Sequence, residues 1–412
     1  MTSKERILCA INGIVGDHVP LTTWCFGFRP PEHLRWNSNG DELKYWYTKR
    51  LEHIHTLPQP WTLEDDFKRV LAWLSVGIDD LLDVSVPWSI DSDVTYSDFV
   101  IPVGAEGGDP YYQVMVRDYQ TPEGAIRHAM KKTGDEADGW PVQPSCVKLF
   151  EDYNVPLGVR HLVTEPCDTE KVKYLYMPSD GSQKKWFTQR MNEVKKFADK
   201  HGVFVQVWSA FGMDAAVWLS GVENATLMAM TDPESFGKLI DSIAETDYAR
   251  TELAVMTPGV EMVCQRGWYS STDFWSPELF EQFIYPNLCK LTALAHQHGK
   301  KFGYVMTTGI EVLGPRLADA GVDLLYFIDP VMDKISLKKA GELFGKRMSI
   351  VGGISSVSLN TFNPGQINHE VKEAIEVLGS TNPFILHPVD SIFPDTPWKS
   401  IEAVIDAWKQ YK

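Results

Sequence analysis

The sequence predicts an α/β fold in which eight parallel strands and their helices close into a (β/α)8 (TIM) barrel that carries an irregular inserted segment. First, strand-like and helix-like segments alternate through the second half of the chain. Second, two further strand-like runs lie upstream, which brings the count to that of such a barrel. Third, 44% of the 412 residues are hydrophobic and 23% are charged, as in a globular protein with a large core. A doubly wound open sheet is the competing architecture.

The expected strands are short runs rich in β-branched and aromatic residues. In chain order they span 19–23, 80–86, 203–208, 260–265, 302–306, 324–328, 348–351 and 383–386. Between the later strands, apolar residues recur at helical spacing. The expected helices span 276–299, 310–320, 336–344, 366–378 and 398–411. Regular alternation of this kind favours a parallel sheet with helices outside it.

The segment 88–180 departs from this alternation. It is rich in Pro, Gly, Asp and Tyr and contains hairpin-like pieces at 99–102 and 111–118. We interpret it as an insertion over one end of the barrel that acts as a lid, and a linker or small subdomain is the alternative. The chain is then one barrel domain over 1–412.

Charge and cysteine content narrow the expected partners and location. The chain has 55 acidic and 39 basic residues, a net charge of −16, so a phosphate backbone or an anionic membrane is not an expected partner. The most apolar stretch, 203–222, is interrupted by Gln206 and Asp214, which argues against a membrane span. The six cysteines form no CxxC pair and no signal peptide is visible, so we expect a cytoplasmic protein.

Several segments resemble the uroporphyrinogen decarboxylase superfamily. Residues 5–20 look like its opening helix and first strand, and Leu-Ala-Asp-Ala-Gly-Val-Asp at 317–323 looks like its LIEAGVD segment. Gly-Gly-Ile at 352–354 and Pro-Asp-Thr-Pro at 394–397 look like two further motifs near its C-terminus. The resemblance covers the N-terminal stretch and most of 200–412, and it implies a (β/α)8 barrel.

The superfamily includes decarboxylases of a tetrapyrrole and corrinoid-dependent methyltransferases. A decarboxylase clamps substrate carboxylates with several arginines, whereas the matching loop here, 24–31, contains only Arg29. The superfamily's late histidine is replaced by Asp390, and an aspartate there would repel an acidic substrate. Its catalytic aspartate matches Asp80 or Asp83. The resemblance therefore favours the methyltransferases.

Thiol-using methyltransferases of the superfamily carry His-x-Cys and a later Cys as zinc ligands. Those positions are Val-Met-Thr at 305–307 and Asp390 in this chain, so a thiolate zinc site is not expected. The resemblance then implies transfer of a methyl group from a small O-methyl donor, such as an aromatic methyl ether, to cob(I)alamin on a partner corrinoid protein. Tetrahydrofolate is the alternative methyl acceptor.

In such a barrel the active site lies at the C-terminal ends of the strands. Demethylation of an ether requires an acid or a metal near the ether oxygen, because either makes that oxygen a better leaving group. The candidate catalytic residues are Asp83, Tyr304, His387 and Asp390. The candidate substrate-binding residues are Trp24, Arg29, Gln206, Trp208, Gln265 and Trp268. His387 and Asp390 are also the candidate ligands of a divalent metal such as zinc. The structural alternatives are loop hydrogen bonds for His387 and Asp390, core packing for the aromatic residues and a surface salt bridge for Arg29.

The resemblance and the candidate site residues are compatible with three functions. The first, which we favour, is a corrinoid-dependent methyltransferase. Its expected partners are a corrinoid protein and a small-molecule methyl donor or acceptor, and a second copy of the chain in a homodimer is a further possible partner. The second is a decarboxylase of the uroporphyrinogen type. The third is a non-catalytic barrel that binds a tetrapyrrole or another small molecule. The 14 tryptophans fit any of them, because large aromatic side chains both fill cores and line pockets for flat ligands.

Overall fold

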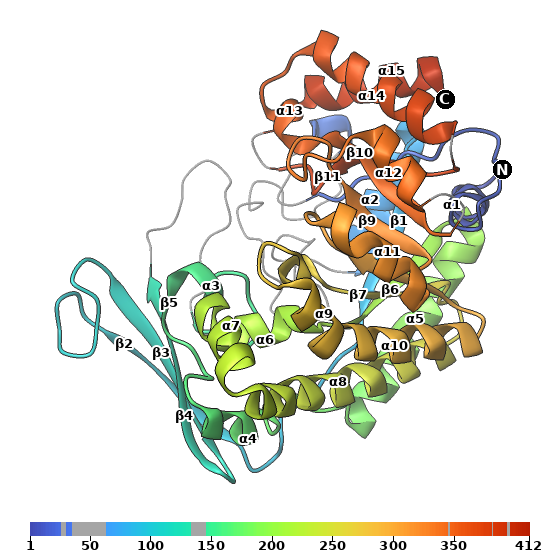
Figure 1. Ribbon diagram of the computed structural model, residues 1–412. Helices are drawn as coiled ribbons and strands as arrows, with labels where there is room; N and C mark the ends of the chain where they lie inside the picture. The colour runs from blue at the N-terminus through green and yellow to red at the C-terminus, as the bar shows by residue number, and fades with distance from the viewer. Residues whose placement is uncertain (26–29, 35–62, 133–145, 345–346, 381, 394–395) are drawn as a thin grey trace.

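The computed structural model describes residues 1–25, 30–34, 63–132, 146–344, 347–380, 382–393 and 396–412 (Figure 1). Among these residues, seven parallel strands form one curled sheet in the order β1-β6-β7-β8-β9-β10-β11. The strands are β1 (Leu81–Ser85), β6 (Phe204–Ala210), β7 (Met262–Gln265), β8 (Lys301–Val305), β9 (Leu324–Ile328), β10 (Ser349–Ser355) and β11 (Ile385–Val389). Each matches an expected strand.

Residues 20–25 take the eighth position of the barrel. The Thr22 N–H donates to the Leu386 carbonyl (3.0 Å), and the Leu386 N–H donates to the Pro20 carbonyl (2.9 Å). On the other side, the Asp79 N–H, two residues before β1, donates to the Leu21 carbonyl (2.7 Å). The segment expected as a strand at 19–23 therefore lies between β11 and the start of β1, and the predicted barrel architecture is confirmed.

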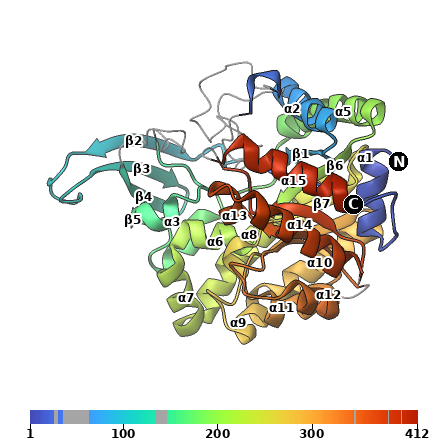
Figure 2. The same cartoon turned by 90° about the horizontal axis from the view of Figure 1, so that it is seen from above.

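Helices surround the parallel sheet (Figures 1 and 2). The longer ones are α2 (Leu63–Val76), α5 (Gly181–His201), α7 (Val222–Thr231), α8 (Pro233–Met256), α10 (Tyr285–Gln297), α11 (Ile310–Ala320), α14 (Pro364–Gly379) and α15 (Trp398–Tyr411). The shorter ones are α1 (Ser3–Ile11), η1 (Glu32–Leu34), α3 (Asn154–Leu157), η2 (Pro166–Asp168), α4 (Thr169–Val172), α6 (Met213–Ser220), η3 (Trp268–Ser270), α9 (Pro277–Phe283), α12 (Leu337–Phe344) and α13 (Ser356–Asn360).

The helix expected over 276–299 is divided into α9 and α10. Its predicted N-cap is confirmed, because the Ser276 hydroxyl accepts a hydrogen bond from the Leu279 N–H (3.3 Å). The helix is interrupted at Ile284, two residues before Pro286. Proline has no N–H and its ring clashes with the preceding turn, so a continuous helix cannot pass this point without a kink.

A second, antiparallel sheet lies between β1 and β6 in the chain. Its order is β2 (Thr95–Ile101), β3 (Gln113–Thr121), β4 (Gly124–Lys132) and β5 (Gly158–Arg160). In both views it projects away from the parallel sheet (Figures 1 and 2). The expected hairpin pieces fall largely in β2 and β3. That the segment 88–180 is a lid over the barrel stays a prediction.

One buried cluster fills the interior of the barrel from end to end. At the N-terminal ends of the strands, Leu81, Phe204 and Leu324 pack with Ile7 and Ala10 of α1 in one buried cluster. The helix α1 thereby closes this end of the barrel. The same cluster continues through the barrel to Trp24, Tyr326 and Phe327 at the C-terminal ends. The interior is a packed core rather than a channel, and only its C-terminal end is left for chemistry.

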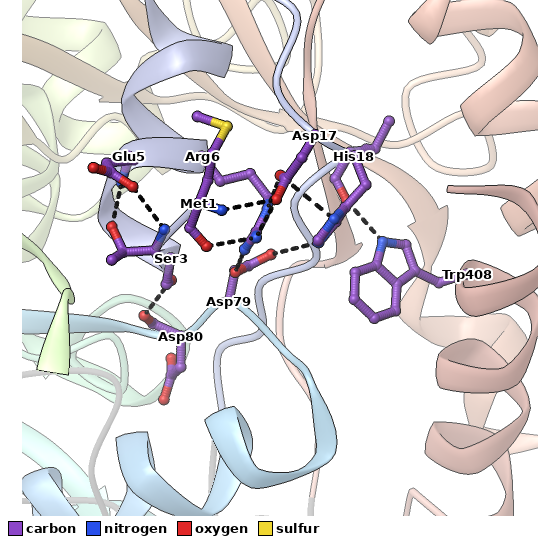
Figure 3. A network of polar contacts seen from close by, with 11 residues as sticks. Met1, Ser3, Glu5, Arg6, Asp17, His18, Asp79, Asp80 and Trp408 are labelled. Carbon is purple, nitrogen blue, oxygen red and sulfur yellow. Dashed lines mark hydrogen bonds and ion pairs between the residues drawn. The ribbon is translucent and has the colours of Figure 1, made fainter.

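An ion-pair network lies at the N-terminal end of the barrel, where α1 meets Asp79, two residues before β1 (Figure 3). The Arg6 guanidinium donates to both carboxylate oxygens of Asp17 (2.7 and 3.0 Å) and to the carboxylate of Asp79. His18 lies beside both acids, and the Trp408 indole donates to the Val19 carbonyl (2.7 Å). This network joins the N-terminal helix, the first strand and the last helix.

Gly352 forms a bulge inside β10. The register between β9 and β10 shifts at Val351/Gly352, and Gly352 has φ +142°, a region that favours glycine. A Cβ there would overlap the Ile328 carbonyl oxygen. We expect Gly352→Ala to lower the free energy of unfolding by about 1–3 kcal/mol, because strained backbone adds to the overlap. Urea unfolding measures this, with Gly181→Ala as the control, since no atom lies within 4 Å of a Cβ at that position.

Candidate active site

Side chains from five parts of the chain converge inside the C-terminal end of the barrel. Alternation along each strand sends Asp83 of β1, Gln206 and Trp208 of β6, Tyr326 of β9 and His387 of β11 inward. Direct contacts connect these inward residues to one another and to Trp24. Four of the predicted substrate-binding residues (Trp24, Gln206, Trp208 and Trp268) and two of the predicted catalytic ones (Asp83 and His387) are therefore brought together here.

Asp83 is held by a chain of hydrogen bonds. Its Oδ1 accepts from the Gln206 amide and from the Trp208 indole (2.9 Å), while the Tyr326 hydroxyl donates to Gln206 Oε1 (2.7 Å). Burial raises the pKa of Asp83 to about 7, against the opposing effect of these hydrogen bonds. Asp83 therefore links β1, β6 and β9 and sits at the floor of the site.

Trp24 is at the centre of an aromatic cluster. Its ring stacks on Tyr326 (5.1 Å between centroids) and meets Trp208 (5.5 Å) and Phe327 (4.9 Å) edge-on. Trp268 lies 6.2 Å from it. The buried Trp24 indole nitrogen has no hydrogen-bond partner among the described residues. The cluster therefore joins Trp24 to β6 and β9, and its indole N–H is a buried donor without a partner among the described residues.

His387 lies beside this cluster and is completely buried. Its Nδ1 pairs with the Thr22 hydroxyl (2.8 Å), which fixes the ring, and its Nε2 has no hydrogen-bond partner within the described part of the chain. Burial lowers the pKa of His387 to about 3, so the imidazole is neutral at physiological pH. A neutral ring cannot act as a strong proton donor, and it instead offers a hydrogen-bonding group through Nε2.

Asp390 follows β11 at the rim of the same cluster. Burial raises the pKa of Asp390 to about 7, while the Arg266 guanidinium and a hydrogen bond from Trp268 act in the opposite direction. Its Oδ1 is buried and has no partner among the described atoms. A carboxyl group with this pKa is partly protonated at neutral pH, which is the property that a general acid needs.

Arg266 is clamped in place next to Asp390. Its Nε donates to Asp214 Oδ2 (3.2 Å), and its guanidinium lies over the rings of Trp268 (4.3 Å) and Trp218 (4.6 Å). Asp214 also accepts from the Tyr269 N–H (2.9 Å). The charge of Arg266 is thus largely compensated inside the protein before any substrate binds.

Two predicted site residues face away from the barrel interior. On β7, Met262 and Cys264 belong to the interior cluster, so Gln265 points to the surrounding helices. On β8, Val305 is interior, whereas Tyr304 packs in the outer cluster and donates to the Ser270 hydroxyl (2.7 Å). The expectation that Tyr304 and Gln265 lie at the barrel mouth is therefore wrong. The reason is strand parity, because neighbouring residues alternate between the two faces of a strand.

Other predicted residues lie elsewhere or outside the described structure. Arg29 and the pair Pro394 and Asp395 fall outside the described residues. Asp80, the other match to the family's catalytic aspartate, is buried in an ion pair with Arg69 before β1. Its remaining oxygen accepts from the Leu81 N–H (2.9 Å), so its role in this structure is to hold α2 against the barrel.

Sequence reasoning missed the contributions of Tyr326, Phe327 and Thr22. All three are inside or beside the aromatic cluster. Tyr326 lies two residues after Leu324 on β9, and alternate residues of a strand share one face. Once Leu324 is known to point inward, the sequence therefore predicts that Tyr326 does so too. Thr22 pairs with a residue 365 positions away, and only the closure of the barrel brings the two together.

The residues present do not fit a zinc site with three protein ligands. Among the described residues, no group of three or more His, Cys, Asp and Glu side chains is placed to hold a metal ion. His387 and Asp390 are two donors without a third, and His387 Nδ1 is already engaged with Thr22.

Residues 158–411 match the uroporphyrinogen decarboxylase (URO-D) family. The chain belongs to this family. It is also 26% identical over 246 residues to the methylcobamide:CoM methyltransferase MtaA of Methanosarcina barkeri strain Fusaro, with 57% of this chain and 67% of the relative covered. A second Methanosarcina barkeri MtaA is 25% identical over 245 residues, with the same coverage.

A solved methyltransferase from Methanosarcina mazei superposes with a TM-score of 0.58 at 16% identity, covering 100% of this chain and 99% of that one. At this identity the match supports the fold alone. Membership of the URO-D family confirms the resemblance drawn from the sequence motifs, and the relatives are methyltransferases. None of the helices in the described ranges combines the length and hydropathy needed to cross a membrane.

Proposed function

We propose that this URO-D family protein is a corrinoid-dependent methyltransferase. It would take a methyl group from a small O-methyl donor, with aromatic methyl ethers as the preferred class, and pass it to a corrinoid protein. The alternative is methyl transfer between the corrinoid protein and tetrahydrofolate. The observation that carries the proposal is a protonatable carboxyl, Asp390, at the rim of an aromatic-lined barrel mouth. Similarity to two MtaA methyltransferases supports the same class of reaction.

The corrinoid would supply the cobalt centre that accepts or delivers the methyl group. What this chain supplies is a binding surface and a proton. The rings of Trp24, Trp208 and Trp268 would hold a flat donor molecule by stacking and by exclusion of water. The unpartnered Trp24 indole nitrogen and His387 Nε2 would orient its polar groups.

Asp390 is the proposed general acid. When a methyl group leaves an aryl ether, the C–O bond breaks and its electron pair stays on oxygen as a phenoxide. Protonation of that oxygen by the Asp390 carboxyl makes it a better leaving group. Arg266 beside Asp390 would then stabilise the carboxylate that remains. His387 and Asp83 act as positioning residues in this scheme, because their hydrogen bonds to Thr22 and Gln206 fix the walls of the site.

Decarboxylation of a polycarboxylate is a weaker alternative. Such a substrate needs several uncompensated cations, and bidentate arginine is the natural partner of each carboxylate. Among the described residues around Asp390, the cation is Arg266, and one arginine that also pairs with Asp214 is too few for several carboxylates.

The direct test is to mix the purified protein with free cob(I)alamin and a panel of methoxyarenes and to follow the visible spectrum of methylcobalamin formation. We expect methylation with at least one methoxyarene and the matching phenol as co-product. Incubation with uroporphyrinogen is the parallel arm. The loss of substrate carboxylates there, or the absence of methylcobalamin with every methoxyarene and methylamine tried, would contradict the proposal.

A further inference from the structure

We propose a second binding site, outside the barrel, for a small and mostly apolar molecule that carries one N–H or O–H donor. The site is a cavity of about 300 Å³ between α8 and α10, beside the C-terminal ends of β6 and β7. Ligand pockets span roughly 300–1,000 Å³, so the cavity can hold a small ring system. It is separate from the Trp24 cluster and does not depend on the proposed methyl transfer.

The walls of the cavity are apolar. Its lining includes the side chains of Met213, Ile240, Ile243, Phe283, Ile284 and Leu291. All six are buried in the outer core, so they do not need an occupant for their own burial. A ligand that fills the space would add dispersion contacts that an open cavity lacks.

Gln265 supplies the polar feature that defines the ligand. It lines the cavity and is only 4% exposed, yet its Oε1 has no hydrogen-bond partner among the described residues. An unsatisfied buried acceptor costs about 1–3 kcal/mol. Its neighbour Gly212 lies so close to the amide that a Cβ there would collide with it, so the glycine leaves room for this side chain. A ligand donor would satisfy the acceptor.

The charges around the cavity favour a neutral ligand. The Asp247 carboxylate, which also lines it, is already saturated by the N–H groups of Phe211 (3.0 Å) and Gly212 (2.7 Å) and by the Tyr176 hydroxyl. At the rim, the exposed Asp241 and Glu245 of α8 are balanced in part by Lys290 of α10. No fully buried free charge remains among these lining residues to demand an ionic partner.

The test compares indole with benzothiophene, two rings of nearly equal shape of which only indole carries an N–H. Binding to the full chain is measured by isothermal titration calorimetry without corrinoid or methyl donor, so the result is independent of the proposed activity. We expect indole to bind about three- to tenfold more tightly than benzothiophene, as one hydrogen bond allows. Gln265→Leu should remove this preference while benzothiophene still binds.

Two obstructing variants locate the binding. Ala244→Trp fills the cavity from α8 and Asn287→Trp fills it from α10, and either should reduce binding of indole at least tenfold. The matched control is Ala249→Trp, which places the same side chain on α8 at a residue that does not line the cavity. The proposal is overturned if neither ring binds, if the folded obstructing variants bind indole like the original chain, or if Gln265→Leu keeps the preference.

Discussion

Replacing Asp390 with asparagine is expected to lower the rate of methyl transfer from an aryl ether by about 10²–10⁴-fold, the usual contribution of a general acid. The amide has nearly the same shape as the carboxyl and keeps the place beside Arg266 and Trp268. It cannot donate an ionisable proton to the leaving oxygen. The measurement is single-turnover methylcobalamin formation with saturating donor, so that a change in donor affinity does not enter the rate.

The pH dependence of the original protein has a definite sign. Because burial raises the pKa of Asp390 to about 7, the acid form is populated below that pH and is lost above it. The single-turnover rate should therefore fall as the pH rises through about 7, and the residual rate of Asp390→Asn should not show this step. A donor with a better leaving group, such as a nitrophenyl methyl ether, should be less affected by the substitution because its oxygen needs less assistance.

The control for Asp390 is Asp199→Asn on the outer helix α5, where the exposed Asp199 carboxylate pairs with Lys195. Its rate should match that of the original chain within twofold. If Asp390→Asn transfers methyl groups as fast as the control at pH 6, the assignment of the general acid is wrong. If the rate falls without any change in the pH profile, Asp390 is a positioning residue instead.

Replacing Arg6 with methionine is expected to lower the free energy of unfolding by about 3–5 kcal/mol, the range found when one partner of a buried ion pair is removed. Arg6 bridges Asp17 and Asp79, and the Asp79 side chain is only 3% exposed (Figure 3). Methionine keeps the apolar stem but leaves Asp79 without its cation. Urea unfolding followed by circular dichroism measures the loss.

The stability of Arg6→Met should depend on pH. Burial already raises the pKa of Asp79 to about 6 despite Arg6, and loss of the cation raises it further. A carboxyl whose folded pKa exceeds its unfolded pKa stabilises the protein when protonated, and this stability is lost as the pH rises through the folded pKa. The variant should therefore lose stability relative to the original protein as the pH rises above about 6.

Two controls separate the buried pair from surface charges. Arg316→Met removes an arginine that is 51% exposed and pairs with Glu281, and it should cost about 0–1 kcal/mol. Combining Arg6→Met with Asp79→Leu should be less destabilising than Arg6→Met alone, because no unpaired charge remains. A loss below about 1 kcal/mol for Arg6→Met would show that water or Asp17 compensates Asp79.

The sequence by itself determined the architecture because secondary-structure periodicity is local. The helix at 310–320 has the bounds that its pattern predicts, and each strand of the parallel sheet falls on an expected run. Motifs at 317–323 and 352–354 pointed to the URO-D family. The helix predicted over 276–299 departs from its pattern at Ile284, because Pro286 interrupts the hydrogen bonding that the apolar periodicity alone does not reveal.

Only the tertiary structure decided which residues share the candidate site. Buried parallel strands are apolar on both faces, so sequence does not show which parity faces inward. Tyr304 and Gln265 were assigned to the mouth and lie on the helix side, whereas Tyr326 was overlooked and lies inside. The pKa of Asp390 and the free acceptor of Gln265 arise from segments far apart in the chain, because burial depends on packing that no local pattern encodes.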